Sequence, residues 1–392
     1  SKKYFDECDE KCSITLRSAL NVHSPVIISS ILTDVEDDTP EELYDQFKQF
    51  EKWLNNPELR DTAVTMIQDK LKTVSIDIKK EKILSKIDEY QRPSNEILYR
   101  NDEYISLRDG GGSEDNEFFF SEKNNYSFDS SCLNSKISHV SKIHKLTETN
   151  AFAGFKRLVG GELNLSLDRD NEQEELKSLK KNLSFDQNIP NRWLPANQVK
   201  GEGIFIEFDY KNLNKWAKKE NIQDRIKKIN HNYNEARINR NPESEEIKLN
   251  PNYLLIHTLS HLIIQKLSFY SGYGSSAIRE KIYCPIRVGN KIEMNGLLLY
   301  TTGGGDGSLG GLCSLADKKY FEGIIISSIK DSDWCSADPV CINSEAQGPQ
   351  RSNMAACHNC LLIPETACDN FNSLLDRDLI INKEYGFFKD LL

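Results

Sequence analysis

The segment from Cys335 to Cys368 reads CSADPVCINSEAQGPQRSNMAACHNCLLIPETAC and is the most unusual part of the sequence. It holds five of the 10 cysteines of a chain of 392 residues. Cysteines are too sparse in the rest of this long chain for the disulfide framework of a small secreted domain. In a reduced protein, thiols clustered in this way indicate a metal site.

The spacing of these cysteines, Cys335-x5-Cys341-x15-Cys357-x2-Cys360-x7-Cys368, favours Zn²⁺. A C-x2-C pair supplies two thiolates from one tight turn, and a structural zinc ion takes four ligands in a tetrahedron. We predict Cys341, Cys357, Cys360 and Cys368 as the ligands, with Cys335 as the alternative fourth ligand. An iron–sulfur cluster, which also takes four thiolates, and a group of unliganded thiols are the other interpretations.

The net charge limits how the protein can meet nucleic acid. Lys and Arg number 50 against 60 Asp and Glu, so any DNA contact needs a local basic patch. Residues 213–240 hold eight basic and three acidic residues, with Trp216 and Tyr233 among them, and residues 136–158 hold five basic residues and one acidic. Such segments can line a nucleic-acid track, although solvated helix faces with extended Lys and Arg stems have the same composition. The candidate DNA-binding residues are Lys218, Lys219, Lys227, Lys228, Arg237, Lys156 and Arg157.

Hydrophobic patterning predicts a mixed α/β protein in two parts. Residues 1–130 are expected to be mostly helical, with helices at about 41–55, 57–90 and 94–107, and residues 109–135 read as a loop or boundary. Residues 131–392 are expected to form an α/β domain closed by a structural zinc site with four cysteines. Its predicted elements are strands at 203–208 and 296–302, an apolar helix that begins after Asn250-Pro251, and a helix at about 308–330.

The apolar helix, from Tyr253 to Tyr270, is long enough to span a bilayer, but it carries His257, His261 and Lys266 near its middle. Ionisable residues at that depth are costly in lipid, so we predict a buried helix in a soluble protein. The N-terminus shows no apolar signal-peptide core. We therefore expect a cytoplasmic protein with no membrane partner.

Motifs for catalysis are weak. His257 and His261 lie one helical turn apart, but a zinc protease would need Glu at position 258, where the residue is Thr, so we interpret both as core histidines. The Gly-rich turn at residues 302–311 lacks the Lys of a phosphate-binding P-loop, and tight backbone packing is favoured over contact with DNA phosphates. No Walker A motif or nucleophile elbow is present. We expect no enzymatic activity.

Several strings, taken in order, resemble one family. The chain is similar to DrmB-like proteins of the DISARM anti-phage system, whose C-terminal zinc-binding domain is shared with MrfA-type helicases. The strings that carry the resemblance are His257–His261, Gly272–Glu280, Leu299–Thr302, Gly307–Gly311, Ala356–Cys360, Pro364–Cys368 and Leu375–Arg377, and upstream Arg17–Val22, Tyr99-Arg100, Glu103-Tyr104, Gly154–Arg157, Trp193–Ala196 and Gly201–Phe205.

The resemblance implies a non-catalytic, DNA-binding partner of a DrmA-like superfamily-2 helicase. This partner would help the helicase to engage DNA and would stimulate it. The long N-terminal part of such proteins is expected to be missing here. Two alternatives remain open at this point. One is an unrecognised metal-dependent nuclease or hydrolase that uses His257, His261, Arg279, Glu280 and Asp306. The other is an assembly scaffold that never contacts DNA.

Overall fold

The computed structural model describes residues 23–33, 40–74, 76, 78–90, 96–124, 126–157, 194–240, 246–289, 293–302 and 310–392. The chain forms two compact units. Unit 1 comprises Ser1–Thr33 and Arg100–Leu392, and unit 2 is the inserted segment Asp34–Tyr99. These borders differ from the division at residue 130 that the sequence suggested.

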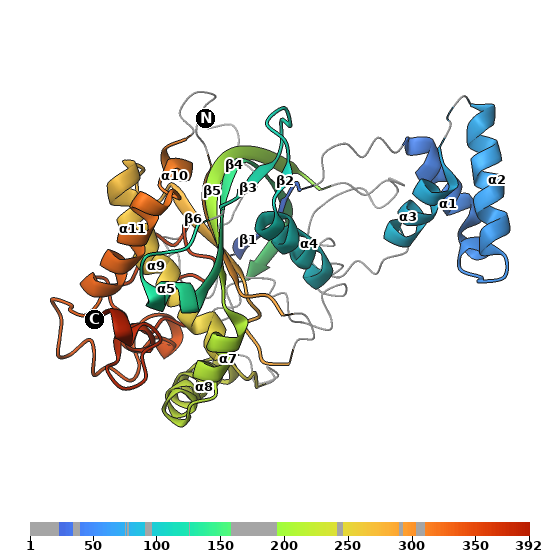
Figure 1. Cartoon of the computed structure of the whole chain (residues 1–392). Coiled ribbons are helices and arrows are strands. Elements are labelled where there is room, and N and C mark those ends of the chain that lie inside the picture. The colour runs from blue at the N-terminus through green and yellow to red at the C-terminus, as the bar shows by residue number, and fades with distance from the viewer. Residues whose placement is uncertain are drawn as a thin grey trace, which may run out of the picture. The chain divides into compact units, whose positions relative to one another are not determined.

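Unit 2 is a small helical domain of α1 (Glu41–Leu54), α2 (Arg60–Thr73) and α3 (Lys80–Tyr90) (Figure 1). Apolar side chains recur at helical spacing and meet in one core, as for Leu43 and Phe47 on α1 and Val64 and Ile67 on α2. The helices predicted at about 41–55 and 57–90 are therefore confirmed, the second as two helices separated by a break after Thr73.

In its described residues, unit 1 is built on one antiparallel sheet of seven strands, in the order β2-β3-β4-β5-β7-β6, with β1 also paired to β4. The long β4 and β5 form its centre. The strands are β1 (His23–Ile31), β2 (Gly111–Gly112), β3 (Phe120–Lys123), β4 (Ile137–Arg157), β5 (Ala196–Phe208), β6 (Ile278–Tyr283) and β7 (Gly296–Thr302). This confirms the mixed α/β class and both predicted strands.

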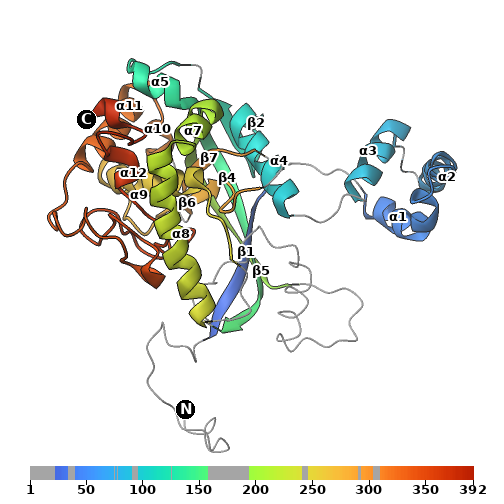
Figure 2. The same ribbon diagram turned by 90° about the horizontal axis from the view of Figure 1, so that it is seen from below.

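The helices of unit 1 lie on both faces of the sheet, with α7, α8, α9 and α11 on one face and α4 on the other (Figures 1 and 2). They are α4 (Glu96–Asp109), α5 (Ser131–Lys136), α7 (Tyr210–Ala217), α8 (Glu220–Arg240), α9 (Pro251–Ser271), α10 (Gly311–Ser314), α11 (Lys318–Asp331) and α12 (Asp378–Ile381), with the 3₁₀ turns η2 (Pro349–Arg351) and η3 (Lys389–Leu391).

Side chains that alternate in direction along β5 explain why helices pack on both faces of the sheet. Ile204 and Ile206 join the large core beneath α9, whereas Phe205 points to the opposite face and packs edge-on against Tyr104 of α4 at a centroid distance of 5.7 Å. Residues 100–136 are thus part of the sheet domain and not of a separate helical region, because α4 covers the sheet and β3 pairs with β4.

Helix α9 is the central helix of unit 1. Asn250 caps its N-terminus by accepting a hydrogen bond from the Asn252 N–H, Pro251 occupies the first helical position, and Gly272 ends it in a left-handed conformation at φ 75°. The helix is buried over most of its length, as predicted. Within the described ranges, no helix combines the length and the hydropathy needed to cross a membrane.

Candidate metal centre

Cysteines of the segment that follows α11 converge on one point. This four-cysteine group consists of Cys335, Cys341, Cys357 and Cys360, whose sulfur atoms all lie within 4.8 Å of one another. The Sγ–Sγ distances are 3.6 Å for Cys335–Cys357, 3.8 Å for Cys341–Cys360 and 3.7 Å for Cys357–Cys360. None of the four is in a disulfide.

These distances fit a tetrahedral zinc site. With zinc–sulfur bonds of about 2.3 Å, the edges of a tetrahedron of four thiolate sulfurs measure about 3.8 Å. The three measured edges lie between 3.6 and 3.8 Å. A disulfide would bring two sulfurs to about 2.05 Å. The four-cysteine group is therefore consistent with a structural zinc site, with every tetrahedral position supplied by the protein.

Backbone N–H groups support the sulfurs. The Ala337 N–H donates to Sγ of Cys335 at 3.4 Å, and the Cys357 N–H donates to Sγ of Cys360 at 3.3 Å. Hydrogen bonds of this kind favour the thiolate form, which is the form that binds a metal. The C-x2-C turn thus places both of its sulfurs and also stabilises one of them as a ligand.

Burial raises the pKa of two of the four thiols. It raises the pKa of Cys341 to about 11 and raises that of Cys360 further. Burial alone would raise the pKa of Cys357 too, but hydrogen bonds from the Asn359 backbone N–H and from neighbouring thiols hold it below its ordinary value. Two of the sulfurs would therefore carry protons at neutral pH without a cation, and a bound cation would displace those protons.

The structure changes one predicted ligand. Cys335, the alternative, completes the four-cysteine group, while Cys368 lies in a second buried group with His257, His261 and Glu280. The reason is topological: the backbone N–H of Glu280 on β6 donates to the carbonyl of Ala367 at 3.1 Å, so the chain at Cys368 runs beside the sheet and α9. The side chain of His358, inside the C-x2-C turn, is exposed.

The predicted basic residues differ in exposure and in pairing. Lys218 and Lys219 are exposed just after α7. Lys227 and Lys228 on α8 are exposed but pair with Asp224 at 2.8 Å and Glu345 at 2.5 Å. Arg237 is buried, with its guanidinium against the ring of Tyr233. The side chains of the last two candidates lie outside the described part of the structure; they are Lys156 and Arg157.

A glutamate side chain binds the N-terminus of α10, the helix that follows the Gly-rich turn. The buried carboxylate of Glu202 on β5 accepts hydrogen bonds from the backbone N–H groups of Gly310 at 2.6 Å, Leu312 at 2.8 Å and Cys313 at 3.3 Å. A protein carboxylate thus takes the donors that a phosphate would need. Residues 303–309 of the turn, including Asp306, lie outside the described residues.

The chain was compared with protein families and with known proteins. No model of a protein family matches the chain. Over 262 residues the chain is 33% identical to the DISARM protein DrmB of Bacillus paralicheniformis (strain ATCC 9945a / NCIMB 11709 / CD-2), a match that covers 65% of this chain and 44% of DrmB. The chain thus spans less than half the length of that relative. Over the aligned residues, the protein is a homologue of the DISARM protein DrmB.

Proposed function

We propose that the chain is a DNA-engaging accessory subunit in a DISARM-like defence against phage. In this proposal it acts beside a DrmA-like superfamily-2 helicase, stimulates that motor, and performs no chemistry itself. Homology to DrmB supports the assignment to the defence system. The four-cysteine group supports an accessory role, since four protein ligands leave a metal ion no open position for a substrate.

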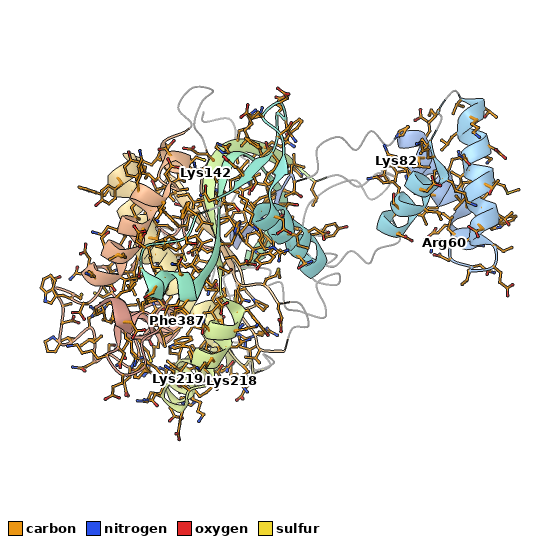
Figure 3. The ribbon with its side chains drawn as sticks, viewed as in Figure 1. Arg60, Lys82, Lys142, Lys218, Lys219 and Phe387 are labelled. Carbon is orange, nitrogen blue, oxygen red and sulfur yellow. The ribbon has the colours of Figure 1, made fainter. Side chains whose placement is uncertain are left out.

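A row of lysines on α7 and directly after it carries the DNA-binding part of the proposal. Lys211, Lys215 and Lys218 are spaced four and three residues apart, which places them on one face of a helix, and Lys219 follows directly. All four are exposed, and Figure 3 places Lys218 and Lys219 at the lower edge of the view. Among the described residues, none forms an ion pair with these four lysines.

The opposite face of α7 is anchored. Leu213 and Trp216 are buried, and the Trp216 indole N–H donates to the carbonyl of Tyr385 at 2.7 Å. The backbone that carries the lysine row is therefore held in place, and the lysine side chains extend into solvent. A row of free cations of this kind suits the phosphate backbone of DNA, which is bound without reading sequence.

Binding of labelled DNA by the intact chain, measured by fluorescence anisotropy over a range of salt concentrations, tests this part. Each lysine that neutralises a phosphate adds about 0.9 to the magnitude of the slope of log K against log salt on duplex DNA. The variant with Gln at positions 211, 215, 218 and 219 should bind much more weakly and with a shallower slope.

The chain provides a matched control. Gln at positions 227 and 228 removes two exposed lysines whose charges are already paired with Asp224 and Glu345. This double variant should bind DNA nearly as the unsubstituted chain does. Unchanged affinity and slope in the α7 variant would refute the assignment of this surface and favour a scaffold that leaves DNA to the helicase.

Two exposed apolar side chains support the partner part of the proposal. Trp334 and Val340, on either side of Cys335, are 71% and 78% exposed. Large apolar side chains on a rigid loop are typical of protein-binding surfaces.

Ser at both positions should reduce co-purification with the DrmA-like helicase and leave DNA binding intact. Ser at Trp53 and Val288, which are also exposed, is the control, and equal retention of the helicase in both double variants would exclude this surface.

A further inference from the structure

A second group of potential ligands lies in the core of unit 1. It consists of His257 and His261 on α9, Glu280 on β6 and Cys368 in the C-terminal segment, and we name it the mixed-ligand group. One ligand atom from each residue lies within 4.8 Å of the others, and all four residues are buried. Three parts of the chain that are distant in sequence thus bring metal-binding atoms to one point.

The distances in this group are close to those around a metal ion. Nε2 of His257 lies 3.1 Å from Sγ of Cys368 and 3.1 Å from Oε1 of Glu280, and Nε2 of His261 lies 3.5 Å from the same carboxylate oxygen. A tetrahedral zinc ion with nitrogen, oxygen and sulfur ligands would set such edges at about 3.4 to 3.6 Å. The two imidazole rings are nearly perpendicular, at 88°.

The hydrogen bond made by His261 leaves a lone pair facing the carboxylate. Its Nδ1 lies 2.9 Å from the carbonyl oxygen of Leu361, which can only accept, so Nδ1 carries a proton. In the neutral ring, Nε2 is then unprotonated, and it has no hydrogen-bond partner in the structure as described. An unprotonated nitrogen and a carboxylate oxygen 3.5 Å apart are two electron-pair donors facing each other, an arrangement that a cation between them would stabilise.

The two ligands that are not histidines accept further hydrogen bonds. Glu280 accepts hydrogen bonds from the Ser260 hydroxyl and from the Asp369 N–H at 3.0 Å. Sγ of Cys368 accepts from the backbone N–H groups of Asn370 at 3.3 Å and Asn372 at 3.1 Å. Such outer contacts fix the orientation of ligands and stabilise a thiolate.

We propose that the mixed-ligand group binds a divalent transition-metal ion, Zn²⁺ by preference, as a second structural site distinct from the four-cysteine group. The mixture of imidazole, thiolate and carboxylate suits zinc, whereas calcium and magnesium take oxygen ligands. All four positions come from buried protein groups, so the ion joins α9, β6 and the C-terminal segment and has no direct access to solvent.

The two sites are linked through adjacent residues. Cys360 is a member of the four-cysteine group, and the carbonyl of the next residue, Leu361, orients His261. The side-chain amide of Gln265 on α9 also donates to the carbonyl of Cys360 at 3.3 Å. The segment from Cys357 to Cys368 is therefore held between two ions, and loss of either should loosen the other.

Metal analysis of the purified full chain tests the proposal without a variant. After incubation with Zn²⁺ and removal of the unbound ion, elemental analysis should find about two ions per chain. X-ray absorption at the zinc edge should find sulfur mixed with nitrogen and oxygen, since the two groups together supply five sulfurs and three lighter ligands. About one ion with only sulfur ligands would show that protons, and not a metal, hold the second group together.

Substitutions assign the ion to its ligands. Glu280→Gln preserves the size of the side chain but removes its charge and one of its two acceptor oxygens, and Cys368→Ser removes the thiol. Each substitution should lower the zinc content by about one ion per chain. The zinc that remains should have mainly sulfur ligands. Cys284→Ser, at another buried cysteine outside both groups, is the matched control and should keep both ions. Retention of both ions and the mixed ligation in Glu280→Gln and Cys368→Ser would overturn the assignment, whatever the unsubstituted chain contains.

Discussion

Arg377 and Asp338 form a hydrogen-bonded ion pair beside the four-cysteine group. Nη2 of Arg377 lies 2.7 and 2.9 Å from the two carboxylate oxygens of Asp338, and Nη1 donates to the carbonyl of Ser332 at 2.9 Å. The carboxylate in turn accepts from the backbone N–H groups of Cys335 at 2.9 Å and Ile342 at 3.0 Å. One arginine near the C-terminus thus orients the loop that carries two of the four cysteines.

Asp338→Asn should destabilise the protein strongly. The substitution leaves the fully buried guanidinium of Arg377 without its counter-charge, and because the Asp338 carboxylate is partly exposed we expect a cost at the lower end of the about 3–5 kcal/mol found for buried pairs. Urea denaturation measures the change in the free energy of unfolding. Asp333→Asn, at an exposed position nearby, should change stability by no more than about 0.5 kcal/mol. Equal stability of the two variants would mean that the ion pair does not support the loop.

Cys360→Ser should remove the metal of the four-cysteine group and destabilise unit 1. A structural zinc site contributes directly to folding, with apparent free energies of about 10–16 kcal/mol in zinc-finger peptides, so a loss of at least ~3 kcal/mol is expected. Thermal unfolding with and without a chelator measures it. Cys132→Ser, outside both groups, is the control. A Cys360→Ser protein that retains all its metal and its melting temperature would contradict the ligand set.

The stability of unit 1 should depend on pH through Glu103. This buried carboxylate on α4 lies 2.8 Å from Nζ of Lys281 on β6 and accepts from the Ile31 N–H of β1 at 2.8 Å. Burial alone would raise its pKa, but Lys281 and the hydrogen bonds hold the pKa below the ordinary value of 4.5.

Because the folded pKa is the lower one, the stabilisation from Glu103 is present above pH 4.5 and is lost as the pH falls through the folded value. Glu103→Gln should therefore be less stable than the unsubstituted chain at pH 7, and the difference should shrink under acid conditions. Unfolding curves across this pH range measure the difference. A difference that does not vary with pH would show that the Glu103–Lys281 charge pair is not its source.

Local structure was predicted well from the sequence. The strand expected at 203–208 lies within β5, and the helix that begins at Pro251 ends where Gly272 takes a positive φ. Residues 311–331 are helical as expected, in two pieces. Caps and apolar periodicity act within a few residues, which is why these features are visible in the sequence.

Contacts between residues that are far apart in the sequence were harder to predict. The sequence placed Cys368 in the zinc site and His257 and His261 among core residues, whereas the structure joins all three with Glu280. The C-x2-C spacing fixes two ligands locally, but the other members depend on how β6 pairs with the residues before Cys368. The two histidines one turn apart were the available signal, and the sequence grouped them with Glu280 only under the alternative of a metal-dependent nuclease or hydrolase.

Anomalous scattering at the zinc absorption edge, from crystals of the full chain, tests the central claim most directly. The account predicts a strong peak at the centre of the Cys335, Cys341, Cys357 and Cys360 sulfurs and a second peak among His257, His261, Glu280 and Cys368. A well-ordered structure with no anomalous peak between the four cysteine sulfurs would contradict it.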